Sequence, residues 1–232
     1  MKIAALFTGG KDSTYSAYLA GKENNLVCLM NMESENADSY MFHTVGSGLL
    51  QMQADAMQLP LERHLTEGRK EEELADLTEF IANVKEKYGI GGVVSGALAS
   101  EYQYARIGRI LERLGLESIT PLWHADVESY LSNLIKDGFR AVIISVSAEG
   151  LDESWLGKEI NAENLKKLVE SSRKYRFHLG FEGGEAETAV LDGPNFRYRV
   201  EINESSIVRD GGKSYLDIRK ASLVPKSPED FS

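Results

Sequence analysis

The sequence predicts an α/β fold, in which a parallel sheet with helices on both faces is followed by a smaller α+β lobe. Two observations support this prediction. Short continuous apolar runs alternate with stretches of helical periodicity from residue 3 to residue 146, as expected for a parallel sheet buried on both faces. After residue 147 the pattern changes: Tyr198, Val200 and Ile202 alternate with polar residues, which is typical of a half-exposed antiparallel strand.

The alternating segments give the order of the predicted elements. The predicted strands of the first part lie at residues 3–7, 26–32, 61–65, 93–96, 118–123 and 141–146. The first predicted helix begins near Tyr15, and the others cover residues 49–59, 74–88, 107–114 and 127–135. Pro60 stops the second helix and Gly115 ends the fourth. In such sheets ligands bind beyond the carboxyl ends of the strands, where the loop after residue 7 lies.

The second part of the chain has different patterns. Apolar residues at helical spacing predict a helix around residues 165–169, and alternation predicts a strand over 196–202. Asp210-Gly211-Gly212 lies between two short apolar segments and predicts a hairpin turn. We therefore expect two domains, residues 1–124 and 125–225, followed by a tail at 226–232.

A glycine-rich loop follows the first strand: residues 8–13 are Thr-Gly-Gly-Lys-Asp-Ser. Gly9 and Gly10 allow the backbone to turn sharply and to approach a ligand closely. The helix N-terminus that follows attracts phosphate through its N–H groups and partial positive charge, and Lys11 adds a full charge. Asp12 supplies a carboxylate suited to the Mg²⁺ that a nucleotide triphosphate carries. The alternative is a simple Gly-Gly turn with an Asp/Ser helix cap, but the strand before and the helix after favour a phosphate loop.

Two better-known phosphate loops do not fit these residues. A Walker A loop needs a glycine five positions before Gly10, and the chain has Ala5 there. The dinucleotide-binding fingerprint needs three spaced glycines, which residues 8–13 do not contain.

Composition excludes several classes of protein. The chain has 232 residues and a net charge of −10, which argues against a broad nucleic-acid-binding surface. Cys28 is the single cysteine, so an internal disulfide or a Cys₂ metal site cannot form, and a reducing cytoplasm is expected. The apolar run at residues 3–7 is too short for a signal peptide, and no run approaches the length of a membrane span.

A second glycine pair lies in an acidic run, Glu-Gly-Gly-Glu-Ala-Glu-Thr at residues 182–188. One interpretation is a loop that presents carboxylates to a cation or to a proton-transfer site. The other is a solvated acidic turn, and the residues alone do not decide between them. Both interpretations treat the run as a loop, because neither a helix nor a central strand suits adjacent glycines.

Two other segments lie beyond predicted strand ends. Residues 100–106 open a helix after the strand at 93–96, and Arg106 can bind a phosphate or a carboxylate with both arms of its guanidinium. A merely solvated Arg106 on an amphipathic helix is the alternative. His43 follows the second strand, at an edge that usually meets the ribose or base. None of the four histidines has zinc-ligand spacing.

Taken together, these motifs resemble the diphthine–ammonia ligase family, a branch of the PP-loop ATP pyrophosphatases. The discriminating motifs are Tyr-Gln-x-x-Arg at 102–106 and Glu-Gly-Gly-Glu at 182–185. Further motifs lie at residues 38–43, 96–106, 121–123, 155–157 and 191–194. The resemblance covers nearly the whole chain and implies a Rossmann-like sheet of the PP-loop (HUP) type. One departure is Phe181, where many eukaryotic members carry glycine.

The resemblance implies ATP and Mg²⁺ as cofactors and assigns roles to residues. Those expected at the phosphates are Thr8, Gly9, Gly10, Lys11, Asp12 and Ser13, with Asp12 on the metal. Those expected at the adenosine are Asn31, Met32, His43, Gly96 and Ala97. Those expected at the acceptor are Tyr102, Gln103, Arg106, Trp123, Glu182, Gly183, Gly184, Glu185, Glu187 and Thr188. The expected catalytic residues are Lys11, Asp12, Arg106, Glu185 and Glu187.

The implied reaction is the amidation of diphthine, a modified histidine of translation elongation factor 2, with ATP and ammonium. The implied partners are therefore that factor, ATP and ammonium. Neither nucleic acid nor a membrane is expected as a partner, and the sequence does not decide whether the chain forms a homodimer. The runner-up is an adenylating PP-loop ligase with a small-molecule or nucleoside acceptor. A nucleotide-binding regulatory protein of the universal-stress type shares the sheet, but the intact Lys11-Asp12-Ser13 and the acidic run speak against it.

Overall fold

The computed structural model describes residues 1–34, 47–66 and 72–227, and the chain divides into two compact units. The first unit comprises Met1–Thr8, Asp12–Leu50 and Leu59–Trp123. The second comprises Gly9–Lys11, Gln51–Gln58 and His124–Ser232. Three residues of the glycine-rich loop thus belong to the same unit as the C-terminal half of the chain.

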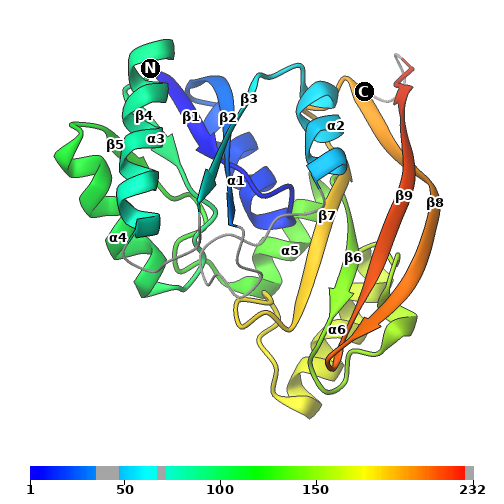
Figure 1. Ribbon diagram of the computed structural model, residues 1–232. Helices are drawn as coiled ribbons and strands as arrows, with labels where there is room; N and C mark the ends of the chain where they lie inside the picture. The colour runs from blue at the N-terminus through cyan, green and yellow to red at the C-terminus, as the bar shows by residue number, and fades with distance from the viewer. Residues whose placement is uncertain (35–46, 67–71, 228–232) are drawn as a thin grey trace. The chain divides into compact units, whose positions relative to one another are not determined.

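The first unit contains a five-stranded parallel sheet with the order β3-β2-β1-β4-β5 (Figure 1). The parallel direction of its strands is as the sequence predicts, and the structure supplies their order. Its strands are β1 (Lys2–Leu6), β2 (Asn25–Ser34), β3 (Leu61–Thr66), β4 (Gly92–Val94) and β5 (Glu117–Ile119). The strand predicted at 118–123 is shorter than expected. Pro121 has no N–H to offer a sheet, and the chain turns there, with the Trp123 N–H donating to the Thr120 carbonyl (3.1 Å).

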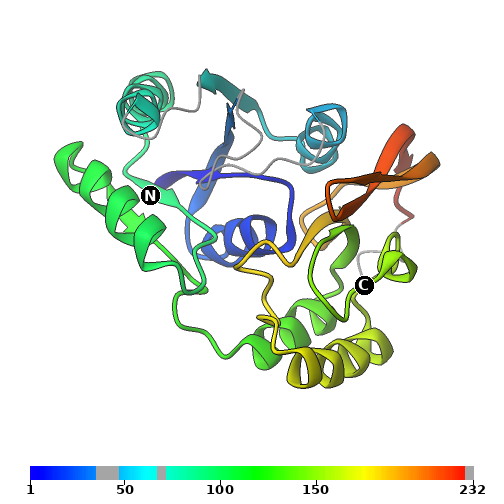
Figure 2. The same ribbon diagram turned by 60° about the horizontal axis from the view of Figure 1, so that its bottom comes forward.

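Helices cover both faces of this sheet, as predicted. The helices of this unit are α1 (Lys11–Gly21), of which Lys11 is grouped with the second unit, α3 (Glu72–Tyr88) and α4 (Glu101–Arg113). Helix α2 (Ser47–Met57) is divided between the two units after Leu50. The α3 and α4 side chains Leu77, Ile81 and Leu111 pack with Ala4 and Val93 of the strands in one fully buried cluster. Helix α1 lies on the opposite face from α3 and α4 (Figure 2). Gly115 follows α4 with φ +63°, a left-handed conformation that suits glycine after a helix.

The second unit contains a four-stranded antiparallel sheet with the order β7-β6-β9-β8. Its strands are β6 (Arg140–Val146), β7 (Ala186–Asp192), β8 (Tyr198–Asp210) and β9 (Lys213–Pro225). Helices α5 (Val127–Lys136) and α6 (Ala162–Tyr175) and the short 3₁₀ helix η1 (Glu153–Trp155) belong to the same unit. Asp126 caps α5 and Asn161 caps α6, each by accepting a backbone N–H three residues on.

Two sequence predictions about this sheet are wrong. The run at 141–146 was expected to continue the parallel sheet, but β6 pairs antiparallel with β7 and β9. An unbroken apolar run reports burial on both faces and not the direction of the neighbouring strands. Strand β7 was not predicted, and it begins inside the acidic run, so Glu187 and Thr188 are strand residues.

The hairpin predicted at Asp210-Gly211-Gly212 is confirmed. Asp210 pairs with Lys213 across a two-residue turn, in which Gly211 and Gly212 have φ +53° and +91°. Positive φ at both central residues is the requirement of the tight turns that suit twisted strands, and glycine meets it without steric cost.

Cys28 lies fully buried in β2, and burial raises the pKa of its thiol to about 12, with the nearby Glu62 carboxylate adding to the effect. Since the thiolate is the reactive form, we expect no reaction of the native protein with a thiol-specific reagent at pH 8. One thiol per chain should react after unfolding in guanidinium chloride. Full reaction of the native protein within the mixing time would contradict this placement.

Candidate active site

The N-terminal part of the glycine-rich loop is tied to the start of α1. The Thr8 N–H donates to the Ser13 hydroxyl (3.2 Å), and the two hydroxyls lie 3.1 Å apart. Asp12 is half-buried in the first turn of α1, and Ser13 is buried. These contacts hold two hydroxyls and a carboxylate at the N-terminus of a helix, where the partial positive charge favours anions.

Gly96 lies against the same helix start. A Cβ atom at this position would be 2.8 Å from the Ser13 nitrogen and 2.9 Å from the Asp12 carbonyl carbon. These distances are too short for any side chain, so the backbone after β4 approaches the backbone of the loop as closely as glycine permits. Gly96 was predicted at the adenosine, and the structure adds a packing reason for glycine there.

Gly9 and Lys11 are bonded to other residues of the second unit, to which they belong. The Lys11 N–H donates to the Thr188 hydroxyl (3.1 Å), and its ammonium donates to the Gly180 carbonyl (2.7 Å). The ammonium also lies 5.1 Å from the centre of the Phe181 ring. Gly9 has φ +77°, and its carbonyl accepts the Val190 N–H (3.0 Å) and the Gln53 amide (2.8 Å). Gly9 and Lys11 are therefore bonded to β7 and to the segment that precedes it.

The predicted adenosine residues lie at strand ends of the first unit. Asn31 is buried in β2, and its amide donates to the Phe7 carbonyl (2.9 Å) at the end of β1. Met32 follows it in β2 and is also buried, as is Ala97 beyond the end of β4. β1 lies between β2 and β4 in the sheet. These residues therefore lie at the carboxyl edge of three neighbouring strands. His43 lies outside the described residues.

The aromatic residues of α4 form two stacks. The Arg106 guanidinium lies 3.7 Å from the centre of the Tyr102 ring and donates to its hydroxyl. Tyr104 stacks on Trp123 with ring centres 4.1 Å apart and planes 12° from parallel. Tyr102 and Tyr104 are more than a third exposed. Gln103 lies between them in the first turn of the helix.

The structure gives the three carboxylates of the acidic run three different environments. Glu182 is exposed. Glu185 accepts the His178 N–H (2.9 Å) at one oxygen and the Gly183 N–H (2.8 Å) at the other. Glu187 forms an ion pair with Lys213 (2.9 Å) in β9. The run is thus neither a uniform acidic turn nor a set of equivalent carboxylates.

Comparison with known proteins gives the family. The model of the diphthamide synthase N-terminal domain matches residues 1–118, and that of the C-terminal domain matches residues 126–224. The diphthine–ammonia ligase of Rattus norvegicus is 39% identical, over 100% of this chain and 98% of its own length. Those of Mus musculus and Homo sapiens are 37% and 36% identical, over 99% of this chain and 97% and 93% of theirs.

The chain belongs to the diphthine–ammonia ligase family. The resemblance seen in the sequence motifs is thereby confirmed over the full length. In this member of the family, Phe181 has φ +65°, the left-handed conformation that favours glycine.

Several residues at this site were not predicted. Gly180 and Phe181 contact the Lys11 ammonium, Gln53 bonds to Gly9, and Tyr104 stacks on Trp123. Three of these contacts join residues more than forty positions apart, and no local pattern reports them. Tyr104 could have been predicted from the sequence, because it lies two residues after Tyr102 inside the discriminating motif.

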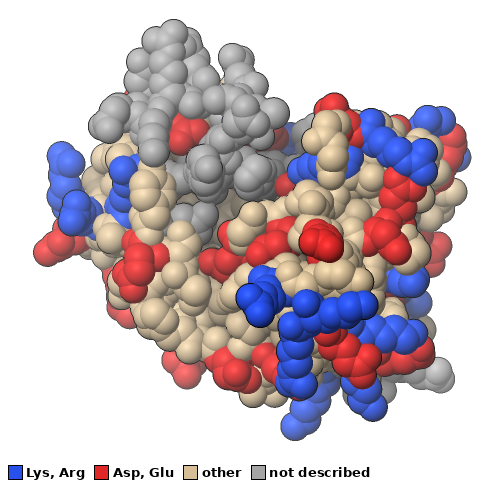
Figure 3. Space-filling view, turned by 90° about the horizontal axis from the view of Figure 1, so that it is seen from below, with Lys and Arg blue, Asp and Glu red and all other residues tan. Residues whose placement is uncertain are grey.

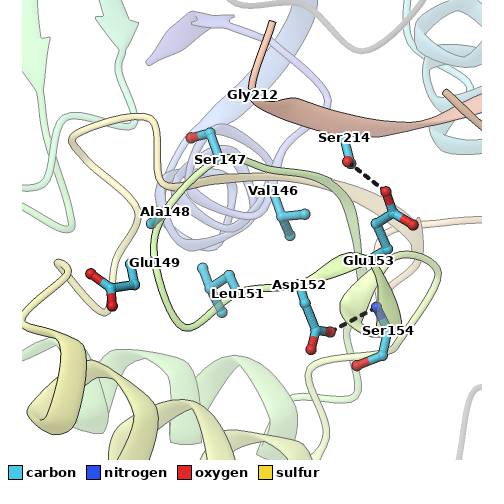
Figure 4. A pocket seen from close by; sticks show the side chains of 10 residues that line it. All are labelled: Val146, Ser147, Ala148, Glu149, Leu151, Asp152, Glu153, Ser154, Gly212 and Ser214. Atoms are coloured by element: carbon cyan, nitrogen blue, oxygen red, sulfur yellow. Dashed lines mark hydrogen bonds between the residues drawn. The ribbon is translucent and has the colours of Figure 1, made fainter. Parts of the chain in front are cut away.

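A pocket of about 630 Å³ opens beside the acidic run in the second unit (Figure 4). It is lined by Val146, Ser147, Ala148, Glu149, Leu151, Asp152, Glu153, Ser154, Gly212 and Ser214. The Ser147 hydroxyl donates to the Gly184 carbonyl (2.7 Å), which joins the pocket to the acidic run. Asp152 accepts the Ser154 N–H and Glu153 pairs with Arg209, and these bonds hold the pKa of each carboxyl below its usual value.

Charged side chains of both signs lie on the surface of the described residues. On the face in Figure 3, several basic side chains adjoin one another below a group of acidic side chains. Among residues 1–34, 47–66 and 72–227, no three His, Cys, Asp or Glu side chains group as a metal site. In the same ranges, no helix is long and apolar enough to cross a bilayer.

Proposed function

We propose that the chain is an ATP-dependent, AMP-forming diphthine–ammonia ligase that amidates the diphthine residue of translation elongation factor 2. The observation that carries the proposal is the similarity to mammalian diphthine–ammonia ligases over 93–98% of their length. The first domain binds ATP and the second contributes to the acceptor site. We place the reaction in the cytoplasm.

The reaction has two steps. The diphthine carboxylate attacks the α-phosphorus of ATP, forming an acyl-adenylate and releasing pyrophosphate. Ammonia, formed when ammonium loses a proton, then attacks the acyl carbon and displaces AMP. The protein accelerates such transfers by holding the reactants in line and by stabilising charge that develops on the leaving group.

The glycine-rich loop suits the triphosphate. Thr8, Gly9, Gly10 and Ser13 contact the β- and γ-phosphates, and Lys11 neutralises charge on the departing pyrophosphate. An ammonium carries three donor hydrogens, so the bond to the Gly180 carbonyl and a bond to phosphate are compatible. Asn31, Met32, Gly96 and Ala97 flank the adenosine.

Mg²⁺ fits the same residues. Magnesium is usually bound by one or two carboxylates together with substrate phosphates and water, so it needs no cluster of protein ligands. Asp12 is the carboxylate at the loop, in the first turn of α1. When bound, the ion would neutralise phosphate charge; the residues of the chain hold and orient the triphosphate.

The acceptor carries a carboxylate beside a trimethylammonium group. Arg106 orients the carboxylate or the α-phosphate, and its stack on Tyr102 restricts the directions in which its guanidinium can donate. Glu182, the exposed carboxylate of the acidic run, pairs with the trimethylammonium. Trp123 offers an aromatic face for the same cation, and its stack on Tyr104 fixes the plane of that face.

A product assay tests the proposal. The protein is incubated with ATP, Mg²⁺, ammonium and elongation factor 2 that carries diphthine, and the mass of the factor is then measured by mass spectrometry. We expect conversion of the carboxylate to an amide, with one AMP and one pyrophosphate per amide. The unmodified factor, which lacks diphthine, is the control and should give neither product.

Each of the other outcomes would indicate a different function for the protein. AMP formation without amidation would support the ATP chemistry and would indicate an acceptor other than diphthine. Release of inorganic phosphate as the primary product would contradict adenylation. Nucleotide binding without turnover would contradict the enzyme and favour a binding protein.

A further inference from the structure

The acidic run contains a feature that the reaction above does not use: both carboxylate oxygens of Glu185 are bonded to the backbone of its own loop. One accepts the His178 N–H and the other the Gly183 N–H, so the carboxylate joins the two ends of the turn. A Cβ on Gly183 would lie 2.9 Å from a Glu185 oxygen, so a side chain there would require the carboxylate to shift. Gly184, at φ +79°, turns the chain back toward β7.

The backbone of Glu185 is anchored as well. Its carbonyl accepts the Ser147 N–H (2.9 Å), and the Ser147 hydroxyl donates to the Gly184 carbonyl (2.7 Å). Inside the turn, the Phe181 N–H donates to the His178 carbonyl (2.8 Å), and the Gly184 N–H donates to the Phe181 carbonyl (3.2 Å). The position of residues 178–184 therefore depends on Glu185.

The segment that Glu185 holds is the one that holds Lys11. Gly180 supplies the carbonyl that accepts the Lys11 ammonium (2.7 Å), and Phe181 supplies the ring above it. Both residues lie between the two N–H groups that Glu185 binds. Lys11 itself is 1% exposed, so its ammonium has little freedom to find another position if this segment moves.

We propose that Glu185 is a positioning residue for Lys11 and not the base that deprotonates ammonium. The proposal rests on the proposed function for the meaning of Lys11, which acts on the triphosphate. A carboxylate offers about four lone-pair directions, and two of those of Glu185 already accept backbone N–H groups. Its effect should therefore appear in the handling of ATP, before ammonium enters.

A double-mutant cycle on ATP binding tests this without any acceptor. The variants are Glu185→Gln, Glu185→Ala, Lys11→Met and the Glu185→Ala/Lys11→Met pair, with ATP affinity measured by calorimetry. Glutamine keeps one acceptor oxygen but turns an NH₂ toward a backbone N–H, so it loses one of the two bonds and keeps the shape. Glu170→Gln, on the exposed face of α6, is the matched control.

We expect Glu185→Ala to weaken ATP binding about 10-fold, which is the effect of one hydrogen bond to a charged group. The same change should alter affinity less than twofold in the Lys11→Met background, because the two residues act as one unit. Additive effects would overturn the proposal, since a merely structural role of Glu185 would be felt with or without Lys11. Wild-type affinity in Glu185→Gln and Glu185→Ala would also overturn it.

The half-reactions separate positioning from base catalysis. Pyrophosphate formation without ammonium reports adenylation, and addition of ammonium to the preformed acyl-adenylate reports amidation. Positioning predicts a slower first step in Glu185→Gln, with the pH dependence of the second step unchanged. A normal first step with a slow second step that has lost its pH dependence would assign the base to Glu185. If the wild-type protein forms no acyl-adenylate, the proposed function fails, and the ATP-binding cycle still decides on Glu185.

Discussion

Replacing Lys11 with methionine is expected to lower the rate of pyrophosphate formation about 100-fold or more, with the fold intact. Loss of one group that stabilises developing charge in a buried site typically costs 10²–10³ in rate. Lys11 is almost fully buried, and methionine fills a similar volume without bringing a charge, so packing around the Phe181 ring is retained. The rate is followed by pyrophosphate release, and the fold by thermal unfolding.

The matched control for this change lies just beyond the other end of the same helix. Lys22 is exposed, and its ammonium lies over the Tyr18 ring, 4.3 Å from the ring centre. Lys22→Met removes the same charge far from the loop in sequence and should leave pyrophosphate release within twofold. If Lys11→Met keeps a rate within threefold of the wild type, Lys11 does not act on the leaving group.

Replacing Gly96 with alanine is expected to abolish ATP binding and to destabilise the first unit. The new Cβ would lie 2.8–3.0 Å from backbone atoms of Asp12 and Ser13, and backbone cannot move aside as the end of a side chain can. Overpacking of this kind costs about 1–3 kcal/mol. Relief of the clash requires displacement of the N-terminus of α1, which carries residues proposed to bind the phosphates. Unfolding in urea measures the first effect, and calorimetry with ATP measures the second.

Gly108 provides the control for this substitution. It lies inside α4, and a Cβ there would have nothing within 4 Å. Gly108→Ala should raise stability by about 0.5–1 kcal/mol, the difference in helix propensity between the two residues, and leave ATP binding unchanged. Equal effects of the two alanines would show that the contact of Gly96 with the loop has no role in binding.

The order of elements in the first unit follows from the sequence because each strand and helix carries its own pattern. Leu77, Ile81 and Val84 recur at helical spacing, and the structure buries all three on one face of α3. Val142, Ile143 and Ile144 also form an unbroken apolar run, yet they lie in an antiparallel sheet. Hydrophobic runs encode burial, whereas strand direction depends on partners that are distant in sequence.

The two motifs of the site differ in how much of their structure the sequence predicts. At the first motif, strand, loop and helix are consecutive, so the positions of Gly9 and of the start of α1 follow from local geometry. At the second, Glu185 and Glu187 differ only through their partners. Glu185 binds backbone N–H groups that no side-chain pattern records, and Glu187 pairs with a lysine 26 residues away. Residue types alone could not separate a loop-building carboxylate from an ion-paired one.

The grouping of Gly9–Lys11 with the C-terminal unit has a consequence for how this protein can be divided. The two family models leave residues 119–125 between them, which is the obvious place for a cut or for an exchange between relatives. Such a cut would leave Lys11 in one fragment and its partners Gly180 and Thr188 in the other. The two halves are therefore not interchangeable parts, and a chimaera should take Gly9–Lys11 and residues 180–190 from the same parent.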